Sequence, residues 1–178
     1  MTVPRRGFLK KGLLGGALLL VGGGAGLALR STRLGQPARA PLKLLTPQEH
    51  AVLAAIAARV VPGDAAPPAW PSAQAVDCAG KIDSLLAQAH PAVGEDFKKL
   101  LGLFENGLAG LLIHTSPTPF TRLAPANQDA RLEAWRRSRL TLLRSGYQAL
   151  VRLVHATYYS APEVYPLVGY PGPPVVPS

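Results

Sequence analysis

LTPQEHAVLAAIAARVV, residues 45–61, contains the clearest helix signal in this sequence. Thr46 supplies a hydroxyl that can cap a helix, Pro47 suits the first turn, and Glu49 stands where a capping box needs a carboxylate. Apolar residues then recur at helical spacing until residues 61–64, Val-Pro-Gly-Asp, interrupt the pattern. The stretch therefore predicts an amphipathic helix from about residue 46 to residue 60.

Four more helices are expected along the chain. The second should cover about residues 72–89, and the third, residues 97–112, has the longest amphipathic pattern and should be central to the core. Pro125 opens the fourth helix, and residues 140–158 carry the apolar pattern of the fifth. Because no alternating strand pattern extends beyond a few residues, the sequence predicts an all-α fold, a small helical bundle of about five helices.

Basic residues are concentrated before this helical region. The net charge is +9, from 19 basic and 10 acidic residues, and 8 of the basic residues but none of the acidic ones lie in residues 1–45. The other 133 residues thus carry 11 basic and 10 acidic side chains and a net charge of +1. A nearly neutral body without a nucleic-acid motif argues against DNA or RNA as a partner.

The start of the chain has the order of an export signal. Residues 4–10, PRRGFLK, match the twin-arginine consensus at every position except the first, and the residues of the signal are Arg5, Arg6, Phe8, Leu9 and Lys10. The 18 residues that follow Lys11 are uncharged, and seven of them are glycine, which suits the weakly apolar signals of the Tat route. An ordinary Sec signal or a transmembrane anchor is the alternative interpretation.

The fate of this leader stays open. Ala38-Arg39-Ala40 has the small-x-small form of a cleavage site, but Pro41 would then be the first mature residue, which suits signal peptidase poorly. If the leader is not cut, its apolar stretch is just long enough to tether the protein to the inner membrane. We expect the protein in the periplasm in either case.

The end of the chain differs from the helical region in composition. Residues 161–178 are rich in Pro and Gly and also contain aromatic and aliphatic residues. The chain is therefore divided into a signal segment and linker (1–45), a helical domain (46–160) and an extended tail (161–178). Because a solvated tail is seldom so apolar, the tail either packs over its own bundle or lies along a partner.

No sequence motif for catalysis, cofactor binding or metal binding is found. The four histidines are isolated from one another and from the cysteine: His50, His90, His114 and His155. The acidic residues, including Asp77, Asp83, Glu95 and Asp96, are interpreted as first-turn or solvated-face charges. We therefore predict no catalytic, cofactor-binding or metal-binding residue in this chain.

The single cysteine and a group of arginines each allow two interpretations. Cys78, the single cysteine, is interpreted as a buried inert thiol, with a mixed disulfide to another chain as the alternative. The arginines at positions 136, 137, 139 and 144 form either a solvated face or a basic patch toward a partner.

Several short motifs, taken in order, resemble the family named for subunit 3 of gluconate 2-dehydrogenase. After the twin-arginine leader these are Leu45-Thr46-Pro47-Gln48-Glu49, Val60-Val61-Pro62, Tyr158-Tyr159-Ser160 and Gly169-Tyr170-Pro171-Gly172-Pro173. The likeness spans nearly the whole chain. Tyr165 stands where the family pattern leads us to expect Trp, so the subfamily and the substrate are not assigned.

The resemblance implies a non-catalytic small subunit of an exported dehydrogenase. Its partner would be a large FAD-containing subunit of the glucose-methanol-choline (GMC) type, with haem c in a cytochrome c subunit. The small subunit would assist maturation of the large one and carry it through the Tat translocase. The residues expected to contact the partner are Tyr158, Tyr159, Tyr165, Gly169, Tyr170 and Pro171. The alternative is a stand-alone periplasmic or membrane-tethered helical protein with no redox partner.

Overall fold

Helix α2 (Pro47–Val60) begins and ends where the sequence predicts. In the computed structural model the Glu49 backbone N–H donates to the Thr46 hydroxyl oxygen at 3.3 Å, and the Glu49 carboxylate accepts from the Thr46 backbone N–H at 2.8 Å. These reciprocal bonds form the predicted capping box. Val61 is extended, so the helix ends at Val60.

The structure describes residues 32–63, 70–106 and 118–174. These residues contain five α-helices, two 3-10 helices and no strand, which confirms the all-α class. The elements after α2 are α3 (Cys78–Gln88), α4 (Pro91–Glu105), η1 (Phe120–Arg122), α6 (Pro125–Arg137), α7 (Thr141–Tyr159) and η2 (Tyr165–Val168). The export-signal residues 5–10 lie outside the described residues, as does His114.

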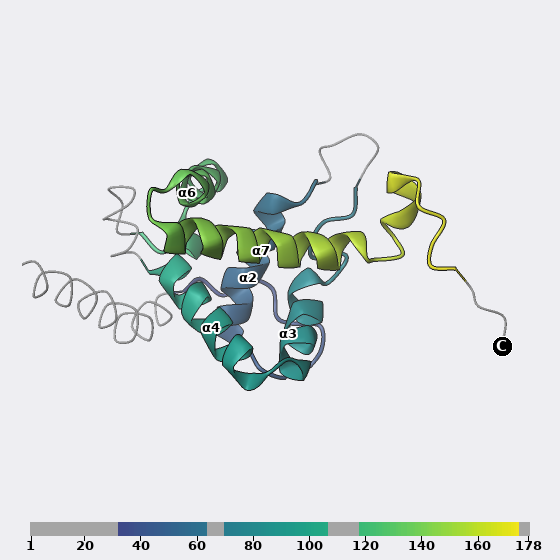
Figure 1. The fold of residues 1–178 in the computed structure, drawn as a ribbon, viewed down its shortest axis with the longest axis horizontal. Helices are drawn as coiled ribbons and strands as arrows, with labels where there is room; N and C mark the ends of the chain where they lie inside the picture. The colour runs from purple at the N-terminus through teal and green to yellow at the C-terminus, as the bar shows by residue number, and fades with distance from the viewer. Residues whose placement is uncertain (1–31, 64–69, 107–117, 175–178) are drawn as a thin grey trace, which may run out of the picture.

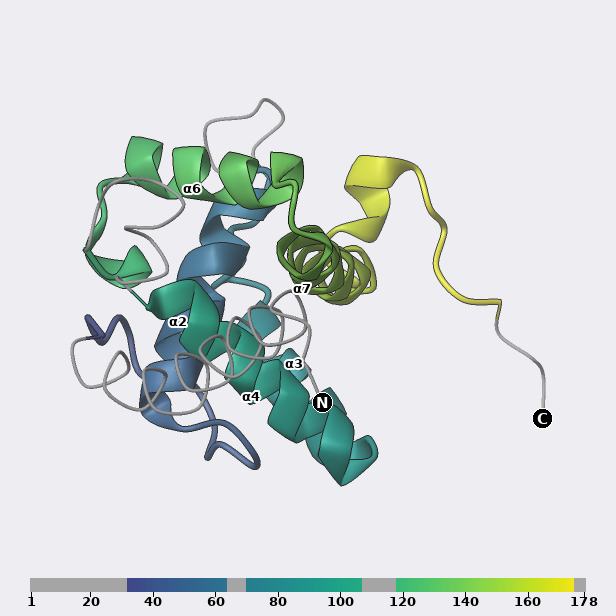
Figure 2. The same cartoon turned by 60° about the vertical axis from the view of Figure 1, so that its left-hand side comes forward.

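Helix α2 forms the centre of the core. It contacts α3, α4, α6, α7 and η1, and Val52, Leu53 and Ile56 have no exposed surface. Figures 1 and 2 show α7 crossing α2, with α6 on one side of α7 and α3 and α4 on the other. Helix α4, which covers much of the third helix expected from the sequence, supplies Leu101 and Phe104 to the core, but α2 makes the more extensive contacts with the other elements.

The second and third helices differ from their predicted bounds. Residues 73–77 form turns, and Asp77 has a left-handed backbone (φ 55°), so α3 begins at Cys78 and not at residue 72. Helix α4 begins at Pro91, and Asn106 is extended (ψ 115°), so one continuous helix over residues 97–112 does not form. Residues 107–112 of that prediction lie outside the described residues.

An aromatic cluster joins α4, η1 and α6 beside α7. The Phe104 ring centroid lies 4.8 Å from that of Phe120 and 4.4 Å from that of Trp135, and all three side chains are buried. Helix α7 passes over this cluster at Gly146, where an added Cβ would lie 2.6 Å from Leu100 Cδ1 and 3.3 Å from Trp135 Cζ3. Glycine at this position therefore permits the close approach of α7.

Residues 32–45, which the sequence-based division assigns to the linker, are bound to the helical body. The Asp83 carboxylate accepts backbone N–H bonds from Lys43, Leu44 and Leu45 at 2.7, 3.0 and 2.7 Å. Asp83 is 1% exposed, so its interpretation as a solvated charge is wrong. A buried carboxylate is stabilised here because it accepts three backbone donors.

No helix in the described part of the chain has the length and apolar character that a membrane span needs. The apolar stretch at residues 12–29 lies outside that part.

Candidate partner interface

Helix α7 ends in two tyrosines that lie in different environments. Tyr158 has no exposed surface, and its hydroxyl donates to the Pro71 carbonyl at 2.6 Å. The prediction that Tyr158 contacts a partner is therefore wrong, because its ring is part of the core of this chain. Tyr159 is 39% exposed, and its ring packs edge-on against Trp70 and His155, with centroids 6.4 and 5.8 Å apart.

The tail folds back at its start before it becomes extended. Ala161 and Val164 have no exposed surface and belong to the core, so residues 161–164 pack on the bundle. Helix η2 follows, and the Tyr165 hydroxyl donates to the Ser160 carbonyl at 2.8 Å. The first part of the tail is therefore held to the end of α7.

Gly169 reverses the chain after η2. Its backbone is left-handed (φ 68°), a conformation that strains any residue with a Cβ. The reversal lets the Tyr170 N–H donate to the Tyr165 carbonyl at 2.9 Å and sets the two rings 5.0 Å apart at 83°. Tyr170 is thus held in a fixed position on the outside of the molecule.

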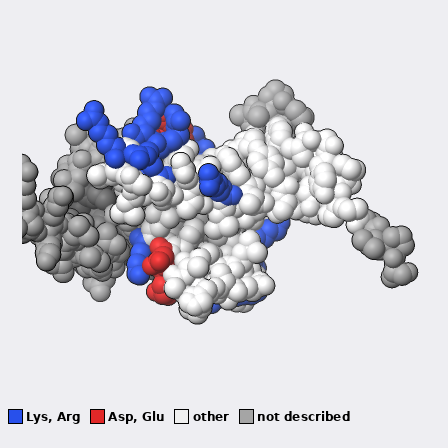
Figure 3. Space-filling model, viewed as in Figure 1, with Lys and Arg blue, Asp and Glu red and all other residues white. Residues whose placement is uncertain are grey.

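We call the surface made by these residues the aromatic end: Tyr159, Tyr165, Val168, Gly169, Tyr170 and Pro171. Tyr159, Val168 and Tyr170 are 39%, 46% and 45% exposed. Between residues 158 and 174 the only charged residue is Glu163. Figure 3 shows this end of the molecule as uncharged in the view of Figure 1. An exposed apolar and aromatic surface of this kind is suited to bind another protein.

Sequence reasoning missed Val168 and Trp70 in this region. Val168 is apolar and exposed because η2 turns it away from the core, and Trp70 supports Tyr159 from the loop that precedes α3. Periodicity gave no indication of either residue, since both lie outside the five α-helices.

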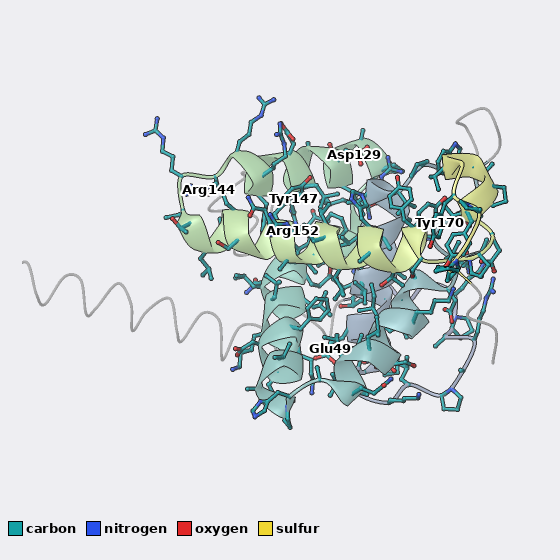
Figure 4. All side chains as sticks on the ribbon, turned by 45° about the vertical axis from the view of Figure 1, so that its right-hand side comes forward. Glu49, Asp129, Arg144, Tyr147, Arg152 and Tyr170 are labelled. Carbon is teal, nitrogen blue, oxygen red and sulfur yellow. The ribbon has the colours of Figure 1, made fainter. Side chains whose placement is uncertain are left out.

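The four arginines noted in the sequence form a second cluster, which is basic and lies at the end of α7 opposite the aromatic end. Figure 4 shows Arg144 and Tyr170 at opposite ends of this helix. Glu133 binds Arg136 through two bonds of 2.6 Å and also pairs with Arg137. The Arg144 guanidinium donates to the Ser138 carbonyl at 2.6 Å. The four arginines that the sequence interprets as a solvated face or a basic patch thus lie at the turn between α6 and α7.

Two buried ionisable residues lie on α4 and α6. Glu105 has no exposed surface and Arg131 is 2% exposed. The Thr121 backbone N–H and hydroxyl donate to the Glu105 carboxylate at 3.0 and 2.5 Å. Burial raises the pKa of Glu105, although the bonds from Thr121 and the charge of Arg131 oppose the rise. The two bonds from Thr121 therefore hold η1 against the end of α4.

Cys78 has no exposed surface, and burial raises the pKa of its thiol to about 11. The thiolate is the reactive form of cysteine, so this side chain is inert in the folded protein. The interpretation as a buried thiol is confirmed, and the folded chain presents no accessible sulfur for a mixed disulfide.

The three described histidines lie in separate environments. His50 is buried, and its burial lowers the pKa of the imidazole. His90 Nδ1 accepts from the Ala92 N–H, and His155 Nε2 lies 2.9 Å from the Val60 carbonyl oxygen. Within residues 32–63, 70–106 and 118–174, no three or more His, Cys, Asp or Glu side chains are grouped as a metal site would require.

A small hollow lies between residues 36–39, α2 and α3. Its volume is about 180 Å³, and His50, Asp77 and Cys78 are among its lining residues. Ligand pockets usually have volumes of about 300–1,000 Å³. This hollow is smaller than that range.

These features define a small all-α protein whose most distinctive surfaces are an apolar aromatic end and a basic turn. The model of the gluconate 2-dehydrogenase subunit 3 family matches residues 47–172, which extend from α2 through the Gly169 turn. The chain belongs to this family, which confirms the resemblance seen in its motifs. Because the family is that of a dehydrogenase subunit, its name supports an accessory role within a dehydrogenase complex.

No curated protein and no solved structure matches this chain in the corresponding searches.

Proposed function

We propose that this protein is the non-catalytic small subunit of an exported dehydrogenase complex. The large subunit is a GMC-type flavoprotein that carries FAD, and a cytochrome c subunit with haem c completes the complex. The small subunit assists maturation of the large subunit and takes it through the Tat translocase by means of the twin-arginine leader. The complex then works in the periplasm, where an uncut leader would tether it to the inner membrane.

The family match over residues 47–172 is the observation that carries this proposal. Two features of the chain agree with it. The leader has the twin-arginine motif at Arg5 and Arg6, and the buried carboxylates of Asp83 and Glu105 accept hydrogen bonds that hold elements of the described body together. Tat substrates cross the membrane folded, so one leader can serve two associated chains.

The aromatic end is the proposed contact with the flavoprotein. Its exposed side chains are apolar, and the Gly169 turn and the Tyr165 hydrogen bonds hold them in place before binding. Aromatic side chains that are already fixed lose little conformational entropy when a partner covers them. Partner contacts are therefore expected at Tyr159, Val168 and Tyr170, with Tyr165, Gly169 and Pro171 beside them.

Surface substitutions test this contact more sharply than removal of the tail. A chain that ends at Ser160 would lose Ala161 and Val164 from the core and would be destabilised for that reason alone. The variant Val168→Ser/Tyr170→Ser changes two half-exposed side chains instead. In its native host the tagged wild-type protein should co-purify a yellow flavoprotein, and this variant should recover at least about tenfold less of it.

The matched control is Leu85→Ser/Val93→Ser, because both residues are 52% exposed and lie on α3 and α4. This control should retain the flavoprotein. The leader is tested separately with Arg5→Lys/Arg6→Lys, which should remove the flavoprotein from the periplasm. A colourless protein recovered alone from the wild-type strain would contradict the proposal and favour a stand-alone envelope protein.

A further inference from the structure

The turn between α6 and α7 exposes two leucines among arginines. Leu140 and Leu142 are 64% and 66% exposed, more than any other large apolar side chain in the described part of the chain. The arginines at positions 136, 137, 139 and 144 lie within four residues of one of them along the sequence. Figure 3 shows the basic side chains gathered over α6 and this turn, next to uncharged surface.

The turn keeps a positive charge after its internal pairs are counted. Glu133 is shared by Arg136 and Arg137, so four arginines and one carboxylate leave a net charge of +3. Arg139 makes no ion pair with any described residue, and Arg144 is directed by its bonds to the Ser138 carbonyl and the Thr141 hydroxyl. A solvated basic face would account for the arginines but not for two exposed leucines.

We propose that residues 136–144 form a membrane-surface contact that binds anionic phospholipid. In such a contact the leucine side chains enter the boundary between headgroups and acyl chains, and the guanidinium groups pair with lipid phosphates. Attraction to an anionic leaflet increases with each arginine near its surface. The combination of apolar and cationic side chains on one turn fits this ligand.

Only a few residues separate the apolar leader from the folded body. This short separation favours a lipid surface over an acidic protein surface as the partner of the turn. The apolar leader stretch ends at Leu29, while Thr32 is already buried and the Arg33 N–H donates to the Thr121 hydroxyl at 2.9 Å. If an uncut leader tethers the protein to the inner membrane, as the proposed function allows, the body is held within a few residues of the bilayer. Figure 1 shows the α6–α7 turn at one end of α7 and the tail at the other, so the aromatic end would face away from the membrane.

A fluorescent label at the turn tests this contact in the full-length protein. Cys78 is buried and inert, so a thiol-reactive NBD dye will label only an introduced cysteine. Leu142→Cys carries the label at the turn, and Leu85→Cys carries it at an exposed position of α3. Both proteins are added to phosphatidylcholine vesicles with and without phosphatidylglycerol, and quenching by nitroxide-labelled lipid is measured.

The label at Leu142→Cys should be quenched in vesicles that contain phosphatidylglycerol, and the label at Leu85→Cys should not. Adding Arg137→Gln/Arg139→Gln to Leu142→Cys should lower the affinity for these vesicles about 10- to 30-fold. Lys98→Gln/Lys99→Gln is the matched control, since these lysines lie on α4 in i,i+3 ion pairs, and it should leave the quenching unchanged.

Equal quenching at the two labelled positions would mean that only the leader enters the vesicle, and it would overturn the proposal. A label at Leu142→Cys that responds to the purified dehydrogenase complex but not to phosphatidylglycerol would also overturn it, in favour of a protein contact. The vesicle assay contains no partner subunit. Its failure is therefore distinct from failure of the proposed subunit role, which co-purification tests.

Discussion

At the scale of single residues, the environment of a side chain decides its chemistry. Cys78 and Asp83 both belong to α3 and both are buried, yet burial affects them differently. The Cys78 thiol is kept protonated because a thiolate would lose its hydration. The Asp83 carboxylate is held by three backbone N–H groups of residues 43–45, which replace the water that it loses.

Burial of Cys78 predicts a loss of stability at high pH. In the unfolded chain the thiol ionises with a pKa near its ordinary value of 9.0, whereas in the folded chain its pKa is about 11. Between these values the unfolded state loses the proton first, so the free energy of unfolding falls as the pH rises from about 9 to about 11. The fall attributable to this group is at most about 2–3 kcal/mol.

Urea unfolding of the wild-type protein and of Cys78→Ala, measured from about pH 8 to about pH 10.5, checks this expectation. The substitution removes the titrating group, so the variant should lose less stability over this range. Identical slopes for the two proteins would contradict the assigned pKa shift.

Sequence spacing placed several of these residues correctly but not their surroundings. It placed Cys78 on the apolar face of its helix, as the structure confirms. It gave the wrong environment for Asp83 and Tyr158, because the groups that bind them lie far away in the sequence. The backbone groups that bind Asp83 belong to residues 43–45, which precede it by 38 to 40 positions. Tyr158 binds Pro71, which precedes it by 87 positions.

At the scale of elements, local sequence sets where the helices begin. The capping box of α2 satisfies two backbone groups through Thr46 and Glu49, and Pro residues occupy the first turns of α4 and α6. These signals need only neighbouring residues, and for that reason the starts of α2 and α6 were predictable.

The capping box predicts a measurable contribution from Thr46. Thr46→Ala removes the hydroxyl that accepts the Glu49 N–H and should lower the free energy of unfolding by about 1 kcal/mol. Gln48→Ala is the control, because Gln48 lies in the same first turn and is half-buried without a capping role. Chemical denaturation compares the two variants, and an equal loss of stability in both would exclude a specific effect of the cap.

Helix ends that depend on backbone conformation were less predictable. Apolar periodicity continues through residues 72–78, but the left-handed backbone of Asp77 prevents the helix from beginning before Cys78. Likewise, the pattern from Phe97 to Leu112 reads as one helix, and only the extended backbone of Asn106 shows that it is interrupted. Periodicity reports which face is buried and does not report where the backbone changes direction.

At the scale of the whole molecule, residues 32–45 connect distant elements. Arg33 binds Thr121 in η1, the Arg39 guanidinium donates to the Ala75 carbonyl at 3.2 Å, and residues 43–45 bind Asp83 in α3. The segment therefore runs across the body and does not behave as a free linker. A cut after Ala40 would remove the contacts of Arg33 and Arg39.

Thr121→Val tests this attachment. The hydroxyl of Thr121 accepts the Arg33 N–H and donates to buried Glu105, so its removal should lower the free energy of unfolding by about 1–3 kcal/mol. It should also speed tryptic cleavage after Arg33, which gel analysis of timed digests would follow. Thr141→Val, which loses only an exposed bond to Arg144, should cleave at the wild-type rate. An unchanged rate in Thr121→Val would show that this bond does not hold the segment.

The sequence by itself determined the all-α class, the family and the apolar faces of the helices. Those properties depend on local propensity, on the period of the helix and on short motifs, all of which neighbouring residues carry. Only the tertiary structure decided that Tyr158 is enclosed while Tyr159 is exposed, and that Asp83 binds residues 43–45. Burial and charge at these positions are set by contacts between residues far apart in the chain, and no short stretch of sequence contains them.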